Sequence, residues 1–168
     1  TGSMTFTPKS DQHGTVTITL RLADTGGGTN GGVDTVLSTF DVTVTPVNDV
    51  PTIIALSDTT ILEDATLQTL SLTGIGTGAA NETQTLSLSA TSSDTTLIAN
   101  PTISYTSPGT TGTLTFTPKS DQHGTVTITL RLADTGGVTN GGVDTVLTTF
   151  DVTVTPVNDT PTIIALSD

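Results

Sequence analysis

Apolar and polar residues alternate along much of this chain. In residues 125–132 apolar side chains alternate with Thr and Arg, and residues 149–155 follow the same pattern. A period of two predicts strands with one face on a core and the other in water. Shorter candidates of the same kind are Leu70 with Leu72, Leu86 with Leu88, Ile103 with Tyr105, and Leu114 with Phe116. With a first strand near residues 52–56, the pattern predicts about seven strands, typical of a Greek-key sandwich.

The spaces between these stretches are rich in Gly, Pro, Asn, Asp and Ser, and no stretch shows a sustained helical period. The same strand pattern occurs twice, because residues 1–58 align without a gap with residues 111–168. The two segments are identical at 53 of 58 positions. This predicts tandem copies of an all-β domain with a period of 110 residues, about the size of a small sandwich.

Proline-containing segments mark the predicted domain boundaries. Residues 46–51 and 156–161 both follow the last strand of a copy, and proline restricts the backbone to extended conformations, so both predict short, stiff linkers. We expect residues 50–159 to be a complete repeat and residues 160–168 to begin the next one. Residues 1–49 would be the C-terminal part of a repeat whose first half is missing.

Acidic residues outnumber Lys and Arg by 16 to 4. A polyanion would be repelled, so nucleic acid is not an expected partner. Short Asp side chains in loops favour Ca²⁺, although acidity also keeps surface proteins soluble. Cys is absent, which excludes disulfides and thiolate sites, and no apolar run approaches the roughly 20 residues of a membrane span. Thr residues suit exposed strand faces, with O-glycosylation as the alternative.

Several motifs together resemble the second half of a cadherin repeat. The chain is most similar to the cadherin-like and Ig-like tandem repeats of very large bacterial surface proteins. The motifs are Gly112–Pro118, Ser120-Asp121-Gln122, Leu132-Ala133-Asp134, the strand through Val152 and Val154 into the Asn-Asp-Xaa-Pro linker, and the acidic turn Ile61–Ala65. The resemblance covers essentially the whole period.

This resemblance implies Ca²⁺ held between consecutive domains. At the far end of the complete repeat the implied ligands are Glu63 or Asp64, Asp121, Asn158 and Asp159. At the inner junction they are Asp11, Asn48, Asp49 and Asp134. Carboxylates and carbonyls are the oxygen ligands that Ca²⁺ prefers.

One departure from the cadherin pattern, and one alternative explanation, leave the metal assignment open. Cadherin linkers usually begin with Asp, whereas Pro46 and Pro156 stand here, so fewer or weaker ions are expected per junction. The alternative is that Asn-Asp-Xaa-Pro is only a stiff turn and that Glu63 and Asp64 form a solvated hairpin.

No motif predicts an enzyme. Ser120, Asp121 and His123 are the residue types of a hydrolase triad, but consecutive turn residues do not converge as a triad requires. The Gly-rich segment 136–142 has neither the Lys nor the following helix of a phosphate loop, and it is best explained as a hairpin connection. Lys119 is expected to be an exposed turn residue, with an intramolecular isopeptide bond as the alternative.

We therefore expect an extracellular spacer or stalk repeat of a large bacterial adhesin or surface fibre, stiffened by Ca²⁺ and flanked by neighbouring repeats. One alternative is a filament subunit in which a neighbouring chain completes the half-domain by strand exchange, since incomplete sandwiches expose strand edges. The other is a carbohydrate-binding module, for which only Tyr105 is a candidate exposed aromatic.

Overall fold

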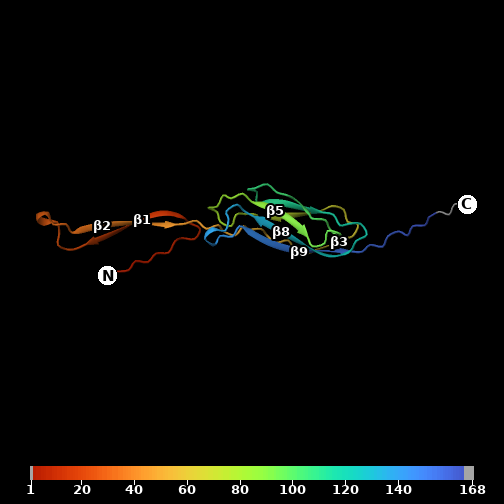
Figure 1. The fold of residues 1–168 in the computed structure, drawn as a ribbon, viewed down its shortest axis with the longest axis horizontal. Coiled ribbons are helices and arrows are strands. Elements are labelled where there is room, and N and C mark those ends of the chain that lie inside the picture. The colour runs from red at the N-terminus through yellow and green to blue at the C-terminus, as the bar shows by residue number, and fades with distance from the viewer. Residues whose placement is uncertain (1, 165–168) are drawn as a thin grey trace. The chain divides into compact units, whose positions relative to one another are not determined.

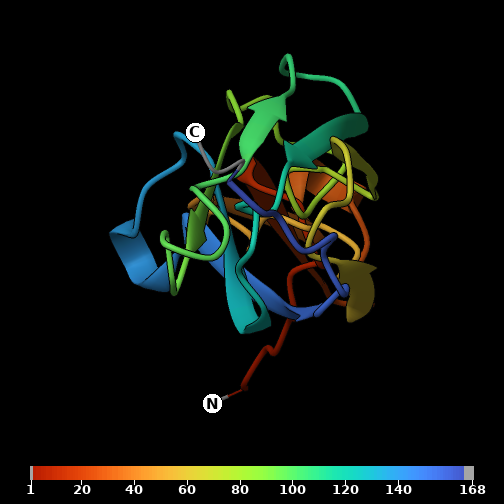
Figure 2. The same ribbon diagram turned by 90° about the vertical axis from the view of Figure 1, so that its right-hand side faces the viewer.

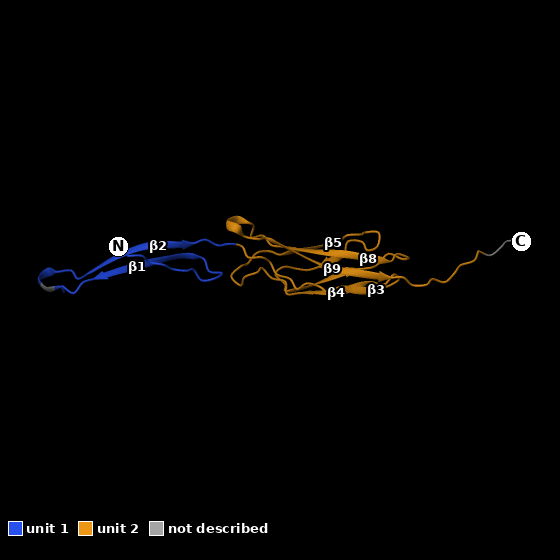
Figure 3. Ribbon diagram, turned by 90° about the horizontal axis from the view of Figure 1, so that it is seen from below, with its two compact units in different colours: residues 1–47 blue, residues 48–168 orange. Residues whose placement is uncertain are grey.

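The chain forms two compact units, residues 1–47 and residues 48–168, and Figure 3 colours them separately. The structure is a computed structural model that describes residues 2–164. The break falls between Val47 and Asn48, two residues before the boundary expected from sequence. The predicted repeat boundaries themselves stay predictions, and residues 165–168 of the expected next repeat lie outside the described part.

Unit 2 is an all-β sandwich, which confirms the predicted fold class. One sheet has the strand order β3-β9-β8-β5 and the other β4-β7-β6, and Figures 1 and 2 show them from two directions. The strands are β3 (Thr59–Leu62), β4 (Gln68–Thr73), β5 (Ser87–Ser92), β6 (Thr102–Ser104), β7 (Thr111–Phe116), β8 (Gly124–Ala133) and β9 (Thr145–Thr155). All pairings are antiparallel except that of β3 with β9.

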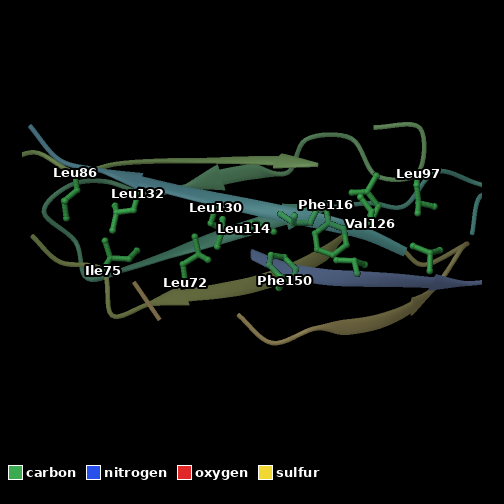
Figure 4. Close-up of a cluster of buried hydrophobic side chains, with 14 residues drawn as sticks. Leu72, Ile75, Leu86, Leu97, Leu114, Phe116, Val126, Leu130, Leu132 and Phe150 are labelled. Carbon is green, nitrogen blue, oxygen red and sulfur yellow. The ribbon is translucent and has the colours of Figure 1, made fainter. Parts of the chain in front are cut away.

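The core of unit 2 lies between these two sheets (Figure 4). The alternating residues of β8 point inward, and Ile128 and Leu130 are essentially inaccessible. Leu72 of β4 and Leu114 of β7 close the core from the other sheet. Burying aliphatic side chains on facing sheets is the main source of stability in such a fold.

The chain between Pro51 and Leu62 passes from one sheet to the other. Thr52 forms an isolated bridge with Gly76, and the Ile54 amide donates to Thr73, so the predicted strand at 52–56 is only a short contact beside β4. The regular strand is β3, which pairs with β9. The prediction placed this first strand too early, because regular pairing begins only after the chain has changed sheets.

The polypeptide enters and leaves unit 2 at opposite ends of β9. Asn48, its first residue, exchanges hydrogen bonds with Val143, just before β9 begins. Val157, just after β9 ends, donates its amide to Glu63. With a rise of about 3.3 Å per residue, these ends are separated by roughly 35 Å.

Unit 1 contains a hairpin of β1 (Gly14–Ala23) and β2 (Thr35–Val44) with the same register as β8 and β9. The face that corresponds to the core of unit 2 is largely uncovered here. Leu20 is 46% exposed and Leu22 71% exposed, whereas Leu130 and Leu132 are each 1% exposed. Unit 1 is thus the hairpin of a sandwich without its second sheet.

Within the described residues no helix has the length and apolar character needed to cross a bilayer.

Candidate functional site

The nine predicted metal-site residues fall mainly into two clusters at the two ends of unit 2. We call residues 48–49, 82–84 and 134–143 the N-terminal pole, and residues 63–64, 121–123 and 157–159 the C-terminal pole. The first surrounds the start of β9 and the second surrounds its end. Asp11 is the exception, because it lies exposed in a turn of unit 1.

At the N-terminal pole the structure brings together Asn48 and Asp134, two of the four residues that the resemblance grouped there. The Asn48 Nδ2 atom donates to the Asp134 carboxylate at 3.0 and 3.3 Å and to the Val143 carbonyl at 2.8 Å. Its Oδ1 atom accepts from the Gln84 amide at 2.7 Å. The Asn48 side chain is therefore fully engaged, and a neutral amide group lies against the Asp134 carboxylate.

Glu82 and Gln84 belong to this pole and were missed by sequence reasoning. One carboxylate oxygen of Glu82 accepts a hydrogen bond from the Asp49 backbone amide at 2.9 Å. The second Glu82 oxygen and the Gln84 side-chain oxygen are buried without a hydrogen-bond partner among the described residues. Both residues lie in the loop before β5, where no periodic pattern or motif marks them. Only their acidic and amide character, close to a predicted strand, was visible in the sequence.

At the C-terminal pole Glu63 is the structural anchor. Its side chain is 5% exposed, and one carboxylate oxygen accepts a hydrogen bond from the Val157 amide at 2.6 Å. The other oxygen lies 3.6 Å from Nδ1 of His123. Glu63 therefore ties the start of the outgoing linker to the turn that follows β3.

Asp64, Asp121 and Asp159 lie exposed around this anchor. The pKa of the Asp64 carboxyl is raised, first by loss of hydration and then by repulsion from Asp159, Glu63 and Asp121. Glu63, Asp121 and Asp159 therefore lie near enough to Asp64 to affect its pKa. Asn158 remains exposed, and its side-chain amide donates to the Asp159 carbonyl at 3.2 Å.

No three or more His, Cys, Asp or Glu side chains within residues 2–164 are grouped closely enough to hold a metal ion. The oxygens present at the C-terminal pole are nevertheless of the kind that Ca²⁺ takes. At the N-terminal pole the fit is poorer, because the Asn48 amide hydrogens already occupy the oxygens of Asp134. The Ca²⁺ roles of all nine residues stay predictions.

The polar turn 120–123 holds no arrangement of a catalytic triad. His123 faces Glu63, and Gln122 donates to the Asp121 carbonyl at 2.8 Å. Tyr105 packs against the core, and its hydroxyl donates to the Gly109 carbonyl at 2.9 Å. The only aromatic side chain considered for sugar stacking is thus half-buried in its own turn.

No protein-family model matches the chain, and no curated protein matches it. Among solved structures, domains 4 and 5 of the S-layer protein SbsC are similar at 18% identity and a TM-score of 0.40, covering 71% of this chain and 63% of that one. A larger SbsC structure, domains 1–6, gives 18% identity and a TM-score of 0.42, covering 85% and 17%. Zebrafish RET cadherin-like domains 1 to 4 give 18% identity and a TM-score of 0.39, covering 74% and 31%.

The chain thus spans less than two thirds of each of these structures. These structures contain several domains of an S-layer protein or several cadherin-like domains. At this distance the likeness concerns only the fold, which the sheet order of unit 2 already establishes.

Proposed function

We propose that this chain is an extracellular structural repeat, a spacer in a large bacterial adhesin or surface fibre, and that it has no enzymatic role. The observation that carries the proposal is the path of the chain through unit 2, a sandwich with its own core. The polypeptide enters beside Val143 and leaves beside Glu63, at opposite ends of β9. A domain of this kind adds length whenever it is repeated in tandem.

The near-identity of the two copies supports the same proposal. At 53 of 58 aligned positions the residue is unchanged, including the residues of both linkers apart from Val50 and Thr160. A spacer gains reach from each identical unit. The partners of this segment are accordingly neighbouring repeats of the same protein.

Ca²⁺ at the C-terminal pole is the second part of the proposal. Asp64, Asp121 and Asp159 are exposed, and Asp64 is repelled by Asp159, Glu63 and Asp121. A divalent cation would offset that repulsion, and the pole of a following repeat would supply further oxygens. Bound ions would then stiffen the junction, and their removal would leave a charged, flexible linker.

Small-angle scattering on chains with one, two and three copies of residues 48–157 tests the spacer. We expect the maximum dimension to grow by a constant step of roughly 35–40 Å per copy, set by the length of β9. A particle that becomes rounder as copies are added would contradict the proposal.

Thermal melts of the same chains in EDTA and in Ca²⁺ test the ion separately. Binding to the native state raises the melting temperature. In the two-copy chain, Asp64→Asn in the first copy together with Asp49→Asn in the second copy, which takes the place of Asp159, should remove that rise. Identical melts and scattering curves with and without Ca²⁺ would contradict the Ca²⁺ part of the proposal. The spacer function would not be affected by that result.

Strand exchange with a neighbouring chain is a second candidate, and unit 1 favours it. A hollow of about 430 Å³ lies against Pro8, Gly14, Val16 and Val44. At the equivalent place in unit 2, Pro118 forms a bridge with Ile98, and Leu97 lies close to Gly124. The occupant that fits the hollow and the uncovered face of the β1–β2 hairpin is therefore a segment equivalent to residues 48–110, supplied by a second copy.

A labelled fragment of residues 48–110 tests this candidate when it is added to the intact chain. We expect a 1:1 complex that Leu20→Asp in β1 abolishes. Absence of binding, or binding that Leu20→Asp leaves unchanged, would exclude strand exchange at this face.

A further inference from the structure

The Asn48 side chain forms hydrogen bonds that neither the spacer proposal nor the Ca²⁺ proposal requires. Its amide donates to Asp134 and Val143 and accepts from Gln84, and its backbone carbonyl accepts the Val143 amide at 3.1 Å. A linker residue is thus bound by two separate loops of the domain that follows it. This contact lies wholly within unit 2.

Residues 134–143 form the loop that receives Asn48. The equivalent loop of unit 1 has two of the same hydrogen bonds, although no asparagine among the described residues is docked in it. In unit 1 the equivalent Asp24 accepts the Gly26 amide at 2.8 Å, as Asp134 accepts that of Gly136 at 2.8 Å. The amides of both aspartates also donate across the hairpin, to Asp34 at 3.0 Å in unit 1 and to Asp144 at 2.9 Å in unit 2. The loop is therefore organised by its own sequence, and the asparagine is added to a formed site.

Two glycines leave the space that the asparagine fills. A methyl group at Gly136 would overlap Oδ1 of Asn48, and one at Gly142 would lie 2.9 Å from its Cβ. Both residues belong to the Gly-rich segment for which the sequence suggested only a flexible connection. Their lack of side chains allows the linker to approach the loop backbone closely.

The orientation of the amide indicates what the site recognises. If the amide were turned around, Oδ1 would face the Asp134 carboxylate and the Val143 carbonyl, which are also acceptors. Only a cation between them would make that arrangement favourable. With the nitrogen inward, each acceptor receives a hydrogen bond and no ion is required.

We propose that the N-terminal pole of each repeat is a binding site for the asparagine side chain of the preceding linker, and that this asparagine clasp holds without a cation. Asn158 is the same ligand in the outgoing linker, and its partner is the N-terminal pole of a further copy of this repeat. The proposal deepens the spacer function and rests on it, but it does not depend on Ca²⁺.

The chain offers a matched pair of variants for the test. Asn48→Ala removes the docked side chain, while Asn158→Ala changes an identical motif whose side chain is exposed. In EDTA we expect Asn48→Ala to lower the melting temperature of unit 2 by roughly 5 °C or more, and Asn158→Ala to leave it unchanged. In Ca²⁺, too, we expect Asn48→Ala to lower the melting temperature.

The Asn48→Asp variant distinguishes the asparagine clasp from a metal site. The substitution keeps the shape, removes the donor and places a carboxylate against Asp134. If the clasp holds without a cation, Asn48→Asp should have a lower melting temperature than Asn48→Ala in both EDTA and Ca²⁺. Recovery of Asn48→Asp by Ca²⁺, or an effect of Asn48→Ala confined to Ca²⁺, would overturn the proposal and assign Asn48 to an ion site.

A longer chain tests the partner of Asn158. When residues 50–159 are joined after Asp159, Asn158→Ala should lower the melting temperature of the added repeat, as Asn48→Ala does for unit 2. An unchanged melting temperature of the added repeat would overturn the assignment of its N-terminal pole as the partner of Asn158. Constant length increments in scattering would still support the spacer, so the two failures are distinguishable.

Discussion

Asp24 and Asp134 occupy the same position of the repeat and have the same immediate neighbours, yet only Asp134 is largely buried. Both form the same turn with the amide two residues ahead. In unit 2, Asn48 donates to Asp134 and a loop of the sandwich packs over the same place, whereas the described part of unit 1 has neither beside Asp24. Local sequence therefore determines the turn, and distant parts of the chain determine the burial.

The paired glycines of this loop give a prediction. Gly136→Ala should lower the unfolding free energy of unit 2 by about 1–3 kcal/mol, because the methyl group would displace Asn48. Gly26→Ala, the equivalent change in unit 1, should leave the unfolding of unit 2 unaltered. Denaturant titration of both variants checks this, and an unchanged unfolding free energy of unit 2 in Gly136→Ala would contradict it.

The raised pKa of Asp64 gives a second prediction, with a definite sign. A carboxyl group with a raised pKa binds its proton more tightly in the folded chain, so its contribution to stability falls as the pH rises through that pKa. Asp64→Asn should therefore stabilise unit 2 at pH 7 in EDTA and low salt, with the difference vanishing below the ordinary value of 3.8. Thermal melts from pH 3 to 7 measure this.

Asp94 is the matched control, since the pKa of its carboxyl group is lowered. The Thr96 hydroxyl donates to it at 2.6 Å and the Thr96 amide at 2.8 Å. Asp94→Asn should destabilise unit 2 at pH 7, and the difference should disappear as the pH falls through the lowered pKa. If both variants responded to pH in the same direction, the repulsion assigned to Asp64 would be wrong.

Part of the candidate site could be predicted from the sequence. The resemblance grouped Glu63 or Asp64 with Asp121, Asn158 and Asp159. In the structure Asp64 lies near Glu63, Asp121 and Asp159, while their Ca²⁺ role stays a prediction. The resemblance also grouped Asn48 with Asp134. Glu82 and Gln84 could not be found in this way, because their loop reaches the linker only after the sheets have packed.

At the scale of elements, identical strands reach different states in the two units. Leu130 in β8 and Leu20 in β1 share their register, but only β8 has a second sheet over it. Leu130→Ala should lower the unfolding free energy by about 2–5 kcal/mol, whereas Leu20→Ala should change it little. Chemical denaturation followed by circular dichroism compares the two, and similar losses would mean that the β1 face is covered in solution.

Alternation predicted β8 and β9 well, because each has one face in the core along its whole length. It missed β3, whose residues Thr59–Leu62 hold only two apolar side chains, and it extended the contact near Thr52 into a strand. The pairing of β3 with β9 joins residues some 90 positions apart. No local pattern specifies such a partner.

At the scale of the whole molecule, strand exchange is limited by the number of segments that can cover a hairpin. The chain has two equivalent hairpins but one segment, residues 48–110, that can cover either of them. Exchange between identical chains therefore leaves the number of uncovered hairpins unchanged, and it brings no net burial of apolar surface.

We expect the native chain to stay monomeric over a wide concentration range if exchange is the only route to assembly. Refolding from denaturant at high concentration should produce exchanged oligomers, because a hairpin can then meet the half of another chain first. Sedimentation velocity before and after refolding distinguishes the two cases. Oligomers that form reversibly without unfolding would require a different interface.

The parallel pairing of β3 with β9 has a mechanical consequence. Tension on a tandem array pulls the incoming chain, which leads into β3, and the outgoing chain, which follows β9, in opposite directions. The pairs from Thr59↔Val152 to Leu62↔Thr155 are then loaded together in shear instead of opening one after another. A stalk built from such repeats would resist pulling through this four-residue ladder, and β3 would be the place where each repeat gives way under force.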